Sequence, residues 1–262
     1  MLRGMAELNG RPVRPAELQA LALTNYGHFT TMRVTNGRVR GLTLHLDRLR
    51  RDCRALFGTE LDLDLVRTYA RRAVPGSGST LLRVTVFDPA LDLGTLGGPA
   101  DPAILVTTRP AGDGAVPPPL RVRSARYVRD QPEVKSVGLF GALRHRRAAQ
   151  LAGYDDALFV DDGGAVSEGG TWNLGLIRDG EPVWPEAAYL PGTTLELLRG
   201  LRPGRGERVP LAGLGGFEAA FATNAAIGVR PIAAVDGVEL AAAYPLITEL
   251  AAAYRALPGD PV

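Results

Sequence analysis

The chain has 262 residues, enough for one or two domains with their own cores. Its 45% hydrophobic and 22% charged residues exclude a disordered chain, and the net charge of +2, with acids and bases interspersed, argues against nucleic-acid binding. The single cysteine, Cys53, excludes an internal disulfide and a cysteine-rich metal site, and we expect no metal. No apolar run is long enough to cross a membrane and residues 1–15 lack a signal-peptide core, so we expect a cytoplasmic protein without a membrane partner.

The first part of the chain carries the turn signals and periodicities of a small α/β domain. Asn9-Gly10 and Asn36-Gly37 each predict a two-residue hairpin turn. The other elements predicted there are helices over 44–58 and 61–74 and strands over 79–88 and 103–108. We therefore expect an N-terminal α/β domain over residues 1–110.

Residues 109–119, RPAGDGAVPPP, have four prolines and no periodicity, which is typical of a crossing between domains. We expect a linker over 111–119 and a second, larger domain over 120–262. Its predicted strands are 120–128, 156–162, several within 165–185 around the Asp179-Gly180 turn, 217–224 and 229–237, and its predicted helices are 138–154, 193–201 and 241–257. The overall prediction is a two-domain α/β (α+β) fold.

Lys135 is the only lysine among 30 basic side chains, the other 29 being arginines. A bias toward arginine can replace solvated lysines, but it cannot replace a lysine that must lose its proton to act as a nucleophile. By itself this composition is equally compatible with a lysine that survived by chance. The residues around Lys135 must therefore distinguish a nucleophilic lysine from one that survived by chance.

The chain offers a candidate for each group that pyridoxal 5'-phosphate requires. An imine-forming lysine is available in Lys135, between a predicted strand and a predicted helix, and a carboxylate for the pyridine nitrogen in Glu168 of VSEGGTWN. Glu168 follows a strand that we expect to lie beside the one leading to Lys135. The alternative for Glu168 is an exposed turn glutamate.

Phosphate candidates lie at helix starts and polar turns. LPGTTLELL places Thr193 and Thr194 at a predicted helix N-terminus, where free N–H groups attract anions, although ordinary capping by threonine is the alternative. Thr223 and Asn224 form a second polar turn with the same ambiguity, and Arg48 offers a cation that is otherwise a solvated helix arginine.

The order of these motifs resembles the class IV aminotransferase family, from about Tyr26 to Gly237. The matching stretches are YGHFTTMRV, HLDRL, VKSVGLFGAL, GYDDALFVDDGGAVSEGGTWNLGLI, LPGTTLELL and FATNAAIGVRPI. The resemblance implies two α/β domains with pyridoxal 5'-phosphate between them, and a homodimer. It assigns the catalytic lysine to Lys135, the phosphate-binding arginine to Arg48 and the pyridine-nitrogen partner to Glu168. The other cofactor-lining residues that it implies are Leu190, Thr193, Thr194, Asn224 and Ala225.

The family contains several reactions, and the sequence separates them only in part. Thr30-Thr31 and TNAAIGVRPI resemble aminodeoxychorismate lyase, which eliminates pyruvate and leaves p-aminobenzoate, whereas the arginine-free loop 86–102 disfavours a dicarboxylate substrate. Gly138 and Phe140 also depart from the family's pattern after the lysine. We therefore expect transamination between a small-molecule amino donor and a keto acid, with the lyase as the alternative and an inactive binding protein as a third. His28 and Thr31 are candidate substrate contacts.

Overall fold

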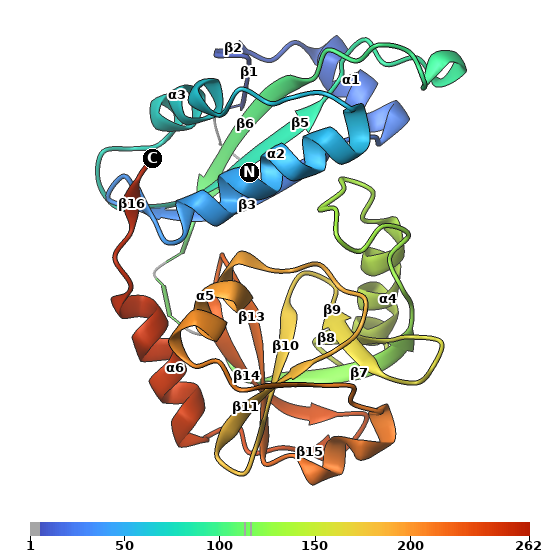
Figure 1. Ribbon diagram of the computed structural model, residues 1–262, viewed down its shortest axis with the longest axis vertical. Helices are drawn as coiled ribbons and strands as arrows, with labels where there is room; N and C mark the ends of the chain where they lie inside the picture. Colours follow the sequence, from blue (N-terminus) through green and yellow to red (C-terminus); the bar gives the residue numbers. More distant parts are fainter. Residues whose placement is uncertain (1–5, 113, 116) are drawn as a thin grey trace. The chain divides into compact units, whose positions relative to one another are not determined.

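The structure is a computed structural model that describes residues 6–112, 114–115 and 117–262. It forms two compact units (Figure 1). The first extends to Gly114 and also includes Val134–Gly138 and Pro258–Val262, and the second comprises Ala115–Glu133 and Leu139–Leu257. The predicted linker 111–119 contains residues 113 and 116, which lie outside the described residues, as does Met5 before the first predicted hairpin.

The first unit is built on an antiparallel seven-stranded sheet in the order β16-β4-β3-β5-β6-β1-β2. Its strands are β1 (Ala6–Leu8), β2 (Arg11–Pro12), β3 (His28–Thr35), β4 (Arg38–Val39), β5 (Ser79–Phe87), β6 (Ala103–Pro110) and β16 (Asp260–Pro261). Helices α2 (Leu42–Phe57) and α3 (Leu63–Ala73) cover one face (Figure 1). The apolar side chains of α2 recur at Leu42, Leu46, Leu49 and Cys53, so one stripe of the helix faces the sheet.

Both predicted hairpins of this unit are confirmed. Asn9 and Asn36 have φ of 49°, with a positive-φ glycine after each, as a type I′ turn requires. The two predicted helices and both longer strands are confirmed within a few residues. Helix α1 (Pro15–Thr24), which lies against the other face through Leu21, was not predicted, because its apolar residues show no clear stripe.

The second unit contains a nine-stranded sheet in which six strands close on themselves. The strands are β7 (Leu120–Arg126), β8 (Asp156–Val160), β9 (Val166–Gly169), β10 (Asn173–Arg178), β11 (Glu181–Pro185), β12 (Arg205–Glu207), β13 (Ala219–Asn224), β14 (Gly228–Val235) and β15 (Val238–Glu239). The pairing order β10-β13-β14-β7-β8-β9 returns to β10, because β9 also pairs with β10. The unit is therefore organised around a closed six-stranded barrel.

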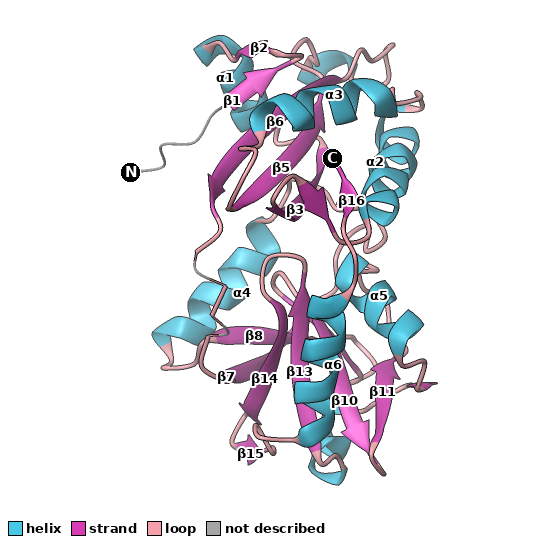
Figure 2. Ribbon diagram, turned by 90° about the vertical axis from the view of Figure 1, so that its left-hand side faces the viewer, coloured by secondary structure: helices cyan, strands magenta, loops and turns pink. Residues whose placement is uncertain are grey.

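Three helices pack outside this barrel (Figure 2). They are α4 (Phe140–Leu151), which packs on β7 and β8, and α5 (Thr193–Leu201) and α6 (Pro245–Ala256), which pack on β13 and β14. Gly175 in β10 lets the Phe221 ring of the neighbouring strand β13 pack against the β10 backbone, since a Cβ at position 175 would lie 2.2 Å from that ring. All three helices were predicted, as were the longer strands, whereas the short β12 and β15 and the 3-10 turns Leu93–Thr95 and Leu211–Gly216 were not. Within the described residues, no helix combines the length and apolar character needed to cross a membrane.

Candidate functional site

Three polar side chains lie on one buried face of α2. His45, Arg48 and Asp52 are spaced by three and four residues, so they project from the same side of the helix, and each is at most 5% exposed. Arg48 Nη2 donates to Thr30 Oγ1 at 2.6 Å and lies 3.3 Å from His45 Nδ1. Since arginine only donates, His45 Nδ1 is an acceptor, and the Thr30 hydroxyl donates to it at 2.7 Å. Burial, Arg48 and Lys135 hold the pKa of His45 well below its usual range, so this histidine is neutral.

Arg48 is a buried cation with an unused donor. Burial lowers its pKa to about 10, against the opposing effect of Asp52, so it stays charged at neutral pH. Its Nε is buried and has no hydrogen-bond partner within the part of the chain that the structure describes. A buried cation with an unsatisfied N–H is suited to an anionic ligand.

Lys135 belongs to the first unit, although β7, the strand before it, ends at Arg126 in the second. Phe29 N–H donates to the Lys135 carbonyl, and Lys135 N–H donates to Asp52 Oδ2, both at 2.9 Å. The lysine Nζ lies 4.9 Å from the centroid of the Phe29 ring. The backbone of Lys135 is thus held at both its N–H and its carbonyl, and its amine lies over the Phe29 ring.

Arg83 of β5 contacts the same ring, with its Cζ 3.6 Å from the Phe29 centroid. Its Nε donates to Thr85 Oγ1, and its register partner on β3 is Thr31. Burial and the neighbouring Arg109 lower the pKa of Arg83 to about 10. Arg83 lies outside loop 86–102 and was not singled out from the sequence. Its alternation with Leu82 and Val84 was the available signal.

His28 and Thr31 point to opposite faces of β3, since their positions differ by three. His28 is fully buried beside the Phe57 ring, with a centroid separation of 6.2 Å, and neither ring nitrogen has a partner among the described residues. Burial lowers the pKa of His28 to about 3. Thr31 is half-buried on the same face as Phe29 and Arg83. Their roles as substrate contacts remain predictions.

In the second unit, Glu168 is a buried carboxylate with a matched cation. It lies in β9, opposite Asn173 of β10. Its Oε1 accepts from Arg129 Nε at 2.6 Å and from Leu190 N–H at 3.3 Å. The side chains of Arg129 and Glu168 are 10% and 4% exposed, so the alternative of an exposed turn glutamate does not hold. The expected neighbour relation of the preceding strands is confirmed, because β7 pairs with β8. Arg129 was not singled out from the sequence.

The LPGTT stretch forms an uncapped helix start. Gly192 is the N-cap of α5 and carries no side chain to bind the first N–H groups, so threonine does not cap this helix. A Cβ at Gly192 would lie 2.0 Å from Asn173 Oδ1, which leaves room only for glycine unless Asn173 moves. Thr193 and Thr194 are buried, and Thr194 Oγ1 lies 3.4 Å from the Tyr254 hydroxyl. The Leu190 carbonyl accepts from Asn173 Nδ2 at 2.8 Å.

The turn between β13 and β14 contains the other two predicted cofactor contacts. Asn224 Oδ1 accepts from the N–H groups of Ala226 and Ile227 at 3.0 Å, so this side chain shapes the turn. Ala225 lies half-buried within it. Thr223 Oγ1, just before, is buried without a hydrogen-bond partner in the described part of the chain.

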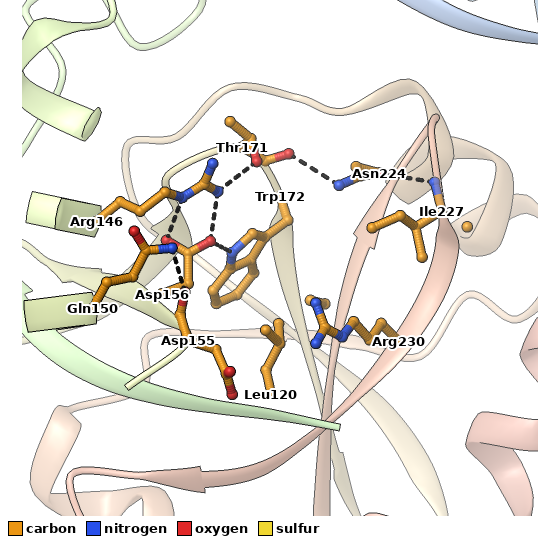
Figure 3. A pocket seen from close by; sticks show the side chains of 12 residues that line it. Leu120, Arg146, Gln150, Asp155, Asp156, Thr171, Trp172, Asn224, Ile227 and Arg230 are labelled. Carbon is orange, nitrogen blue, oxygen red and sulfur yellow. Dashed lines mark hydrogen bonds and ion pairs between the residues drawn. The ribbon is translucent and has the colours of Figure 1, made fainter. Parts of the chain in front are cut away.

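A polar pocket of about 340 Å³ adjoins this turn (Figure 3). On its wall, Asp156 accepts from Arg146 at 2.9 and 2.5 Å and from Trp172 Nε1 at 2.8 Å. Arg146 also donates to Thr171 Oγ1 at 2.7 Å. The network ties α4 and β8 to residues 171 and 172, so it stabilises the loop that follows Glu168.

The sequence model of the amino-transferase class IV family matches residues 27–235. The chain belongs to the class IV aminotransferase family. The match includes Arg48, Lys135, Glu168 and the LPGTT stretch, and it confirms the resemblance inferred from their order. No curated protein matches the chain significantly.

Solved structures show that the class IV fold extends over nearly the whole chain. A branched-chain aminotransferase from Thermoproteus uzoniensis, solved with norvaline, is 22% identical with a TM-score of 0.81, over 95% of this chain and 93% of its own. A fold IV transaminase from Curtobacterium pusillum is 24% identical with a TM-score of 0.80, over 97% and 99%. A hypothetical aminotransferase from Mycobacterium tuberculosis in its PLP-bound form is 19% identical with a TM-score of 0.81, over 96% and 98%. The predicted α/β fold is confirmed.

Within each unit, the structure gathers part of the predicted site. In the first unit, Arg48 lies on α2, and the Lys135 backbone is bonded to Asp52 of the same helix. In the second unit, the Leu190 N–H donates to Glu168. Four residues that the sequence did not single out support these sites. In the first unit, Asp52 binds the Lys135 backbone and Arg83 contacts the Phe29 ring beneath the lysine amine. In the second, Asn173 binds the Leu190 carbonyl and Arg129 binds the Glu168 carboxylate.

Proposed function

We propose that this chain is a pyridoxal 5'-phosphate-dependent aminotransferase that moves an amino group between an amino acid or amine and a keto acid through Lys135. The observation that carries the proposal is that buried polar side chains at the predicted cofactor positions are arranged as a ligand would require. Arg48 offers an unpartnered buried N–H, and Glu168 is a buried carboxylate held by a buried arginine. Arrangements of this kind are expensive to bury without a ligand or a functional reason.

The residues present fit the cofactor. In the first unit, Arg48 is suited to a phosphate group. In the second unit, the N–H groups at the start of α5 and the unpartnered Thr223 hydroxyl are suited to a phosphate as well, and Glu168 is suited to the pyridine nitrogen. When bound, pyridoxal 5'-phosphate supplies a carbonyl that an amine can capture and a ring that withdraws electrons from the substrate. The single lysine supplies the amine, and Leu190, Thr193, Thr194, Asn224 and Ala225 would line the ring and phosphate.

The chain's own residues would then carry the proton and charge steps. Lys135 Nζ takes a proton from the substrate carbon and returns it, with its backbone fixed at both N–H and carbonyl. Glu168 would hold the pyridine nitrogen of the bound cofactor, and Arg129 orients that carboxylate through its hydrogen bond. Arg48 would hold the phosphate and so keep the reacting groups in place while the proton moves.

The lyase-like elimination that yields p-aminobenzoate and pyruvate is the second candidate. Loop 86–102 contains no arginine, which disfavours the dicarboxylate substrate of such a lyase. Arg83 weakens that argument, because it contacts the same aromatic ring as Lys135 Nζ and has no ion-pair partner among the described side chains. A substrate carboxylate beside Arg83 is compatible with either reaction.

We also propose that the protein acts as a homodimer in the cytoplasm. Support for self-association comes from α4, where Phe140, Leu143 and Leu151 are 76%, 46% and 71% exposed and line one groove. Such an apolar stripe on a surface helix is typical of a covered surface.

The single lysine makes the central test direct. Protein incubated with pyridoxal 5'-phosphate and then reduced with borohydride should carry one covalent adduct on the peptide containing Lys135, detected by mass spectrometry. Lys135→Arg, which keeps the charge but cannot form the bond, should carry none. Unreacted wild-type protein would contradict the proposal and favour an inactive binding protein. Half-reactions with a panel of amino donors then separate the two reactions, since pyruvate release without an acceptor indicates the lyase.

A further inference from the structure

A buried carboxylate on α2 is bonded to the backbone of the lysine, 83 residues away. Asp52 Oδ2 accepts from Lys135 N–H at 2.9 Å, and its side chain is fully buried. Its other oxygen, Oδ1, accepts from Arg51 Nε and Nη2 at 3.1 and 2.8 Å. A carboxylate is costly to bury, and these donors offset that cost.

Residues 134–138 are also attached to the first unit through backbone hydrogen bonds near the start of β3. Phe29 N–H donates to the Lys135 carbonyl, and Val137 N–H donates to the Gly27 carbonyl, each at 2.9 Å. Both of these donor–acceptor pairs link the segment to the start of β3. The bond from Asp52 links it to α2 instead, and α2 is anchored in the core through Leu49 and Cys53, which are fully buried.

We propose that Asp52 is a positioning residue: its carboxylate ties the backbone of Lys135 to α2, in addition to the bonds at the start of β3, and so aims the amine at the cofactor carbonyl. The inference rests on the proposed function. Without this acceptor the Lys135 N–H loses its bond to α2, and the segment keeps its two bonds at the start of β3 but not the one that ties it to the helix. Capture of the cofactor joins Lys135 Nζ to the aldehyde carbon and releases one water, so it depends on where that amine lies.

Asp52 also lies one turn from Arg48, and an effect through the phosphate is the rival explanation. Two ligands separate the explanations. Capture of pyridoxal 5'-phosphate requires both the phosphate-binding site and the lysine. Pyridoxamine 5'-phosphate carries an amine in place of the aldehyde, so its binding requires the phosphate-binding site but no bond to the lysine.

The experiment uses the full chain with Asp52→Leu, which keeps the branching at Cγ but has no acceptor, and Asp52→Asn, which keeps an acceptor. Asp47→Leu, at a 58% exposed position of the same helix, is the matched control. The rate of covalent capture, followed by absorbance and borohydride trapping, should fall about tenfold or more in Asp52→Leu and little in Asp52→Asn. Affinity for pyridoxamine 5'-phosphate should stay within about twofold in both.

Equal losses for the two ligands, or capture by Asp52→Leu at the wild-type rate, would overturn the proposal. Hydrogen–deuterium exchange of the peptide covering 134–138 gives a second readout in the cofactor-free protein, and it should accelerate in Asp52→Leu. If Asp52→Leu fails to fold, Asp52→Ser, with a shorter side chain that reaches Lys135 N–H less well, takes its place under the same criteria. Wild-type protein that never captures the cofactor would instead refute the proposed function and leave the exchange result to decide the role of Asp52.

Discussion

Arg129 Nε donates a 2.6 Å hydrogen bond to Glu168 Oε1, and both side chains lie almost wholly out of water. Removing one partner of a buried ion pair leaves the other charge unpaired, which is strongly destabilising. We therefore expect Arg129→Met to lower the free energy of unfolding by about 3 kcal/mol, measured by urea denaturation.

The matched control for that pair is Arg126→Met. Arg126 is nearby in sequence, but its side chain is 73% exposed and lies 3.9 Å from the Asp162 carboxylate, and its hydrogen bond from Nη2 to the Asp162 carbonyl, at 3.2 Å, is exposed to solvent. Its replacement should change the free energy of unfolding by no more than about 0.5 kcal/mol. Similar losses in the two variants would show that the buried pair has no special role.

Arg48→Leu should weaken binding of the phosphate group selectively. Hydrogen bonds to charged groups contribute about 1.5–3 kcal/mol, so affinity for pyridoxal 5'-phosphate should fall roughly 10- to 100-fold. Affinity for pyridoxal, which has no phosphate, should hardly change. Titration of both ligands checks this, with Arg50→Leu at a 43% exposed position of α2 as the control. Equal losses for both ligands would mean that Arg48 does not bind the phosphate.

Arg83→Met tests whether this arginine recognises a substrate carboxylate. Amino donors with an anionic side chain should lose about tenfold or more in kcat/KM, whereas donors with an alkyl side chain should lose less. Arg109→Met, an exposed arginine on the adjacent strand, is the control for a general change of charge. Uniform losses across all donors would indicate a structural role for Arg83 instead.

His28 should make the stability of the protein depend on pH. Its pKa is about 3 when folded and about 6.5 when unfolded, so below pH 6.5 the unfolded state binds a proton that the folded state does not. Stability is present above pH 6.5 and is lost progressively as the pH falls toward 3. Between pH 7 and 5 the loss from His28 is about 2 kcal/mol, and His28→Leu should remove that part.

Urea denaturation at both pH values measures the effect of His28. His145→Gln is the control, since His145 lies half-buried on α4 and should contribute less. An unchanged pH dependence in His28→Leu would show that His28 gains a proton in the folded protein.

The apolar groove of α4 should support the proposed homodimer. The double variant Phe140→Glu and Leu151→Glu places charges on the two most exposed apolar positions of that helix, and it should shift the protein toward monomer in light scattering after size exclusion. Leu65→Glu, at a 43% exposed position of α3, should leave the mass unchanged. A double variant with the wild-type mass would exclude this surface from the dimer.

Local features of the sequence determined most of the secondary structure and the family. Asn36-Gly37 predicts its hairpin because asparagine and glycine tolerate positive φ, and α2 is visible because its apolar residues recur at helical spacing. The single lysine and the ordered motifs around Glu168 and LPGTT indicated the class IV family.

Only the tertiary structure decided which groups surround these residues. Asp52 and Lys135 are 83 positions apart, and Arg129 and Glu168 are 39 apart, so no periodicity links them. The placement of 134–138 in the first unit, and the β9–β10 pairing that closes the barrel, likewise depend on contacts between distant segments. A local pattern records what one element prefers, whereas a buried charge finds its partner only when separate elements fold together.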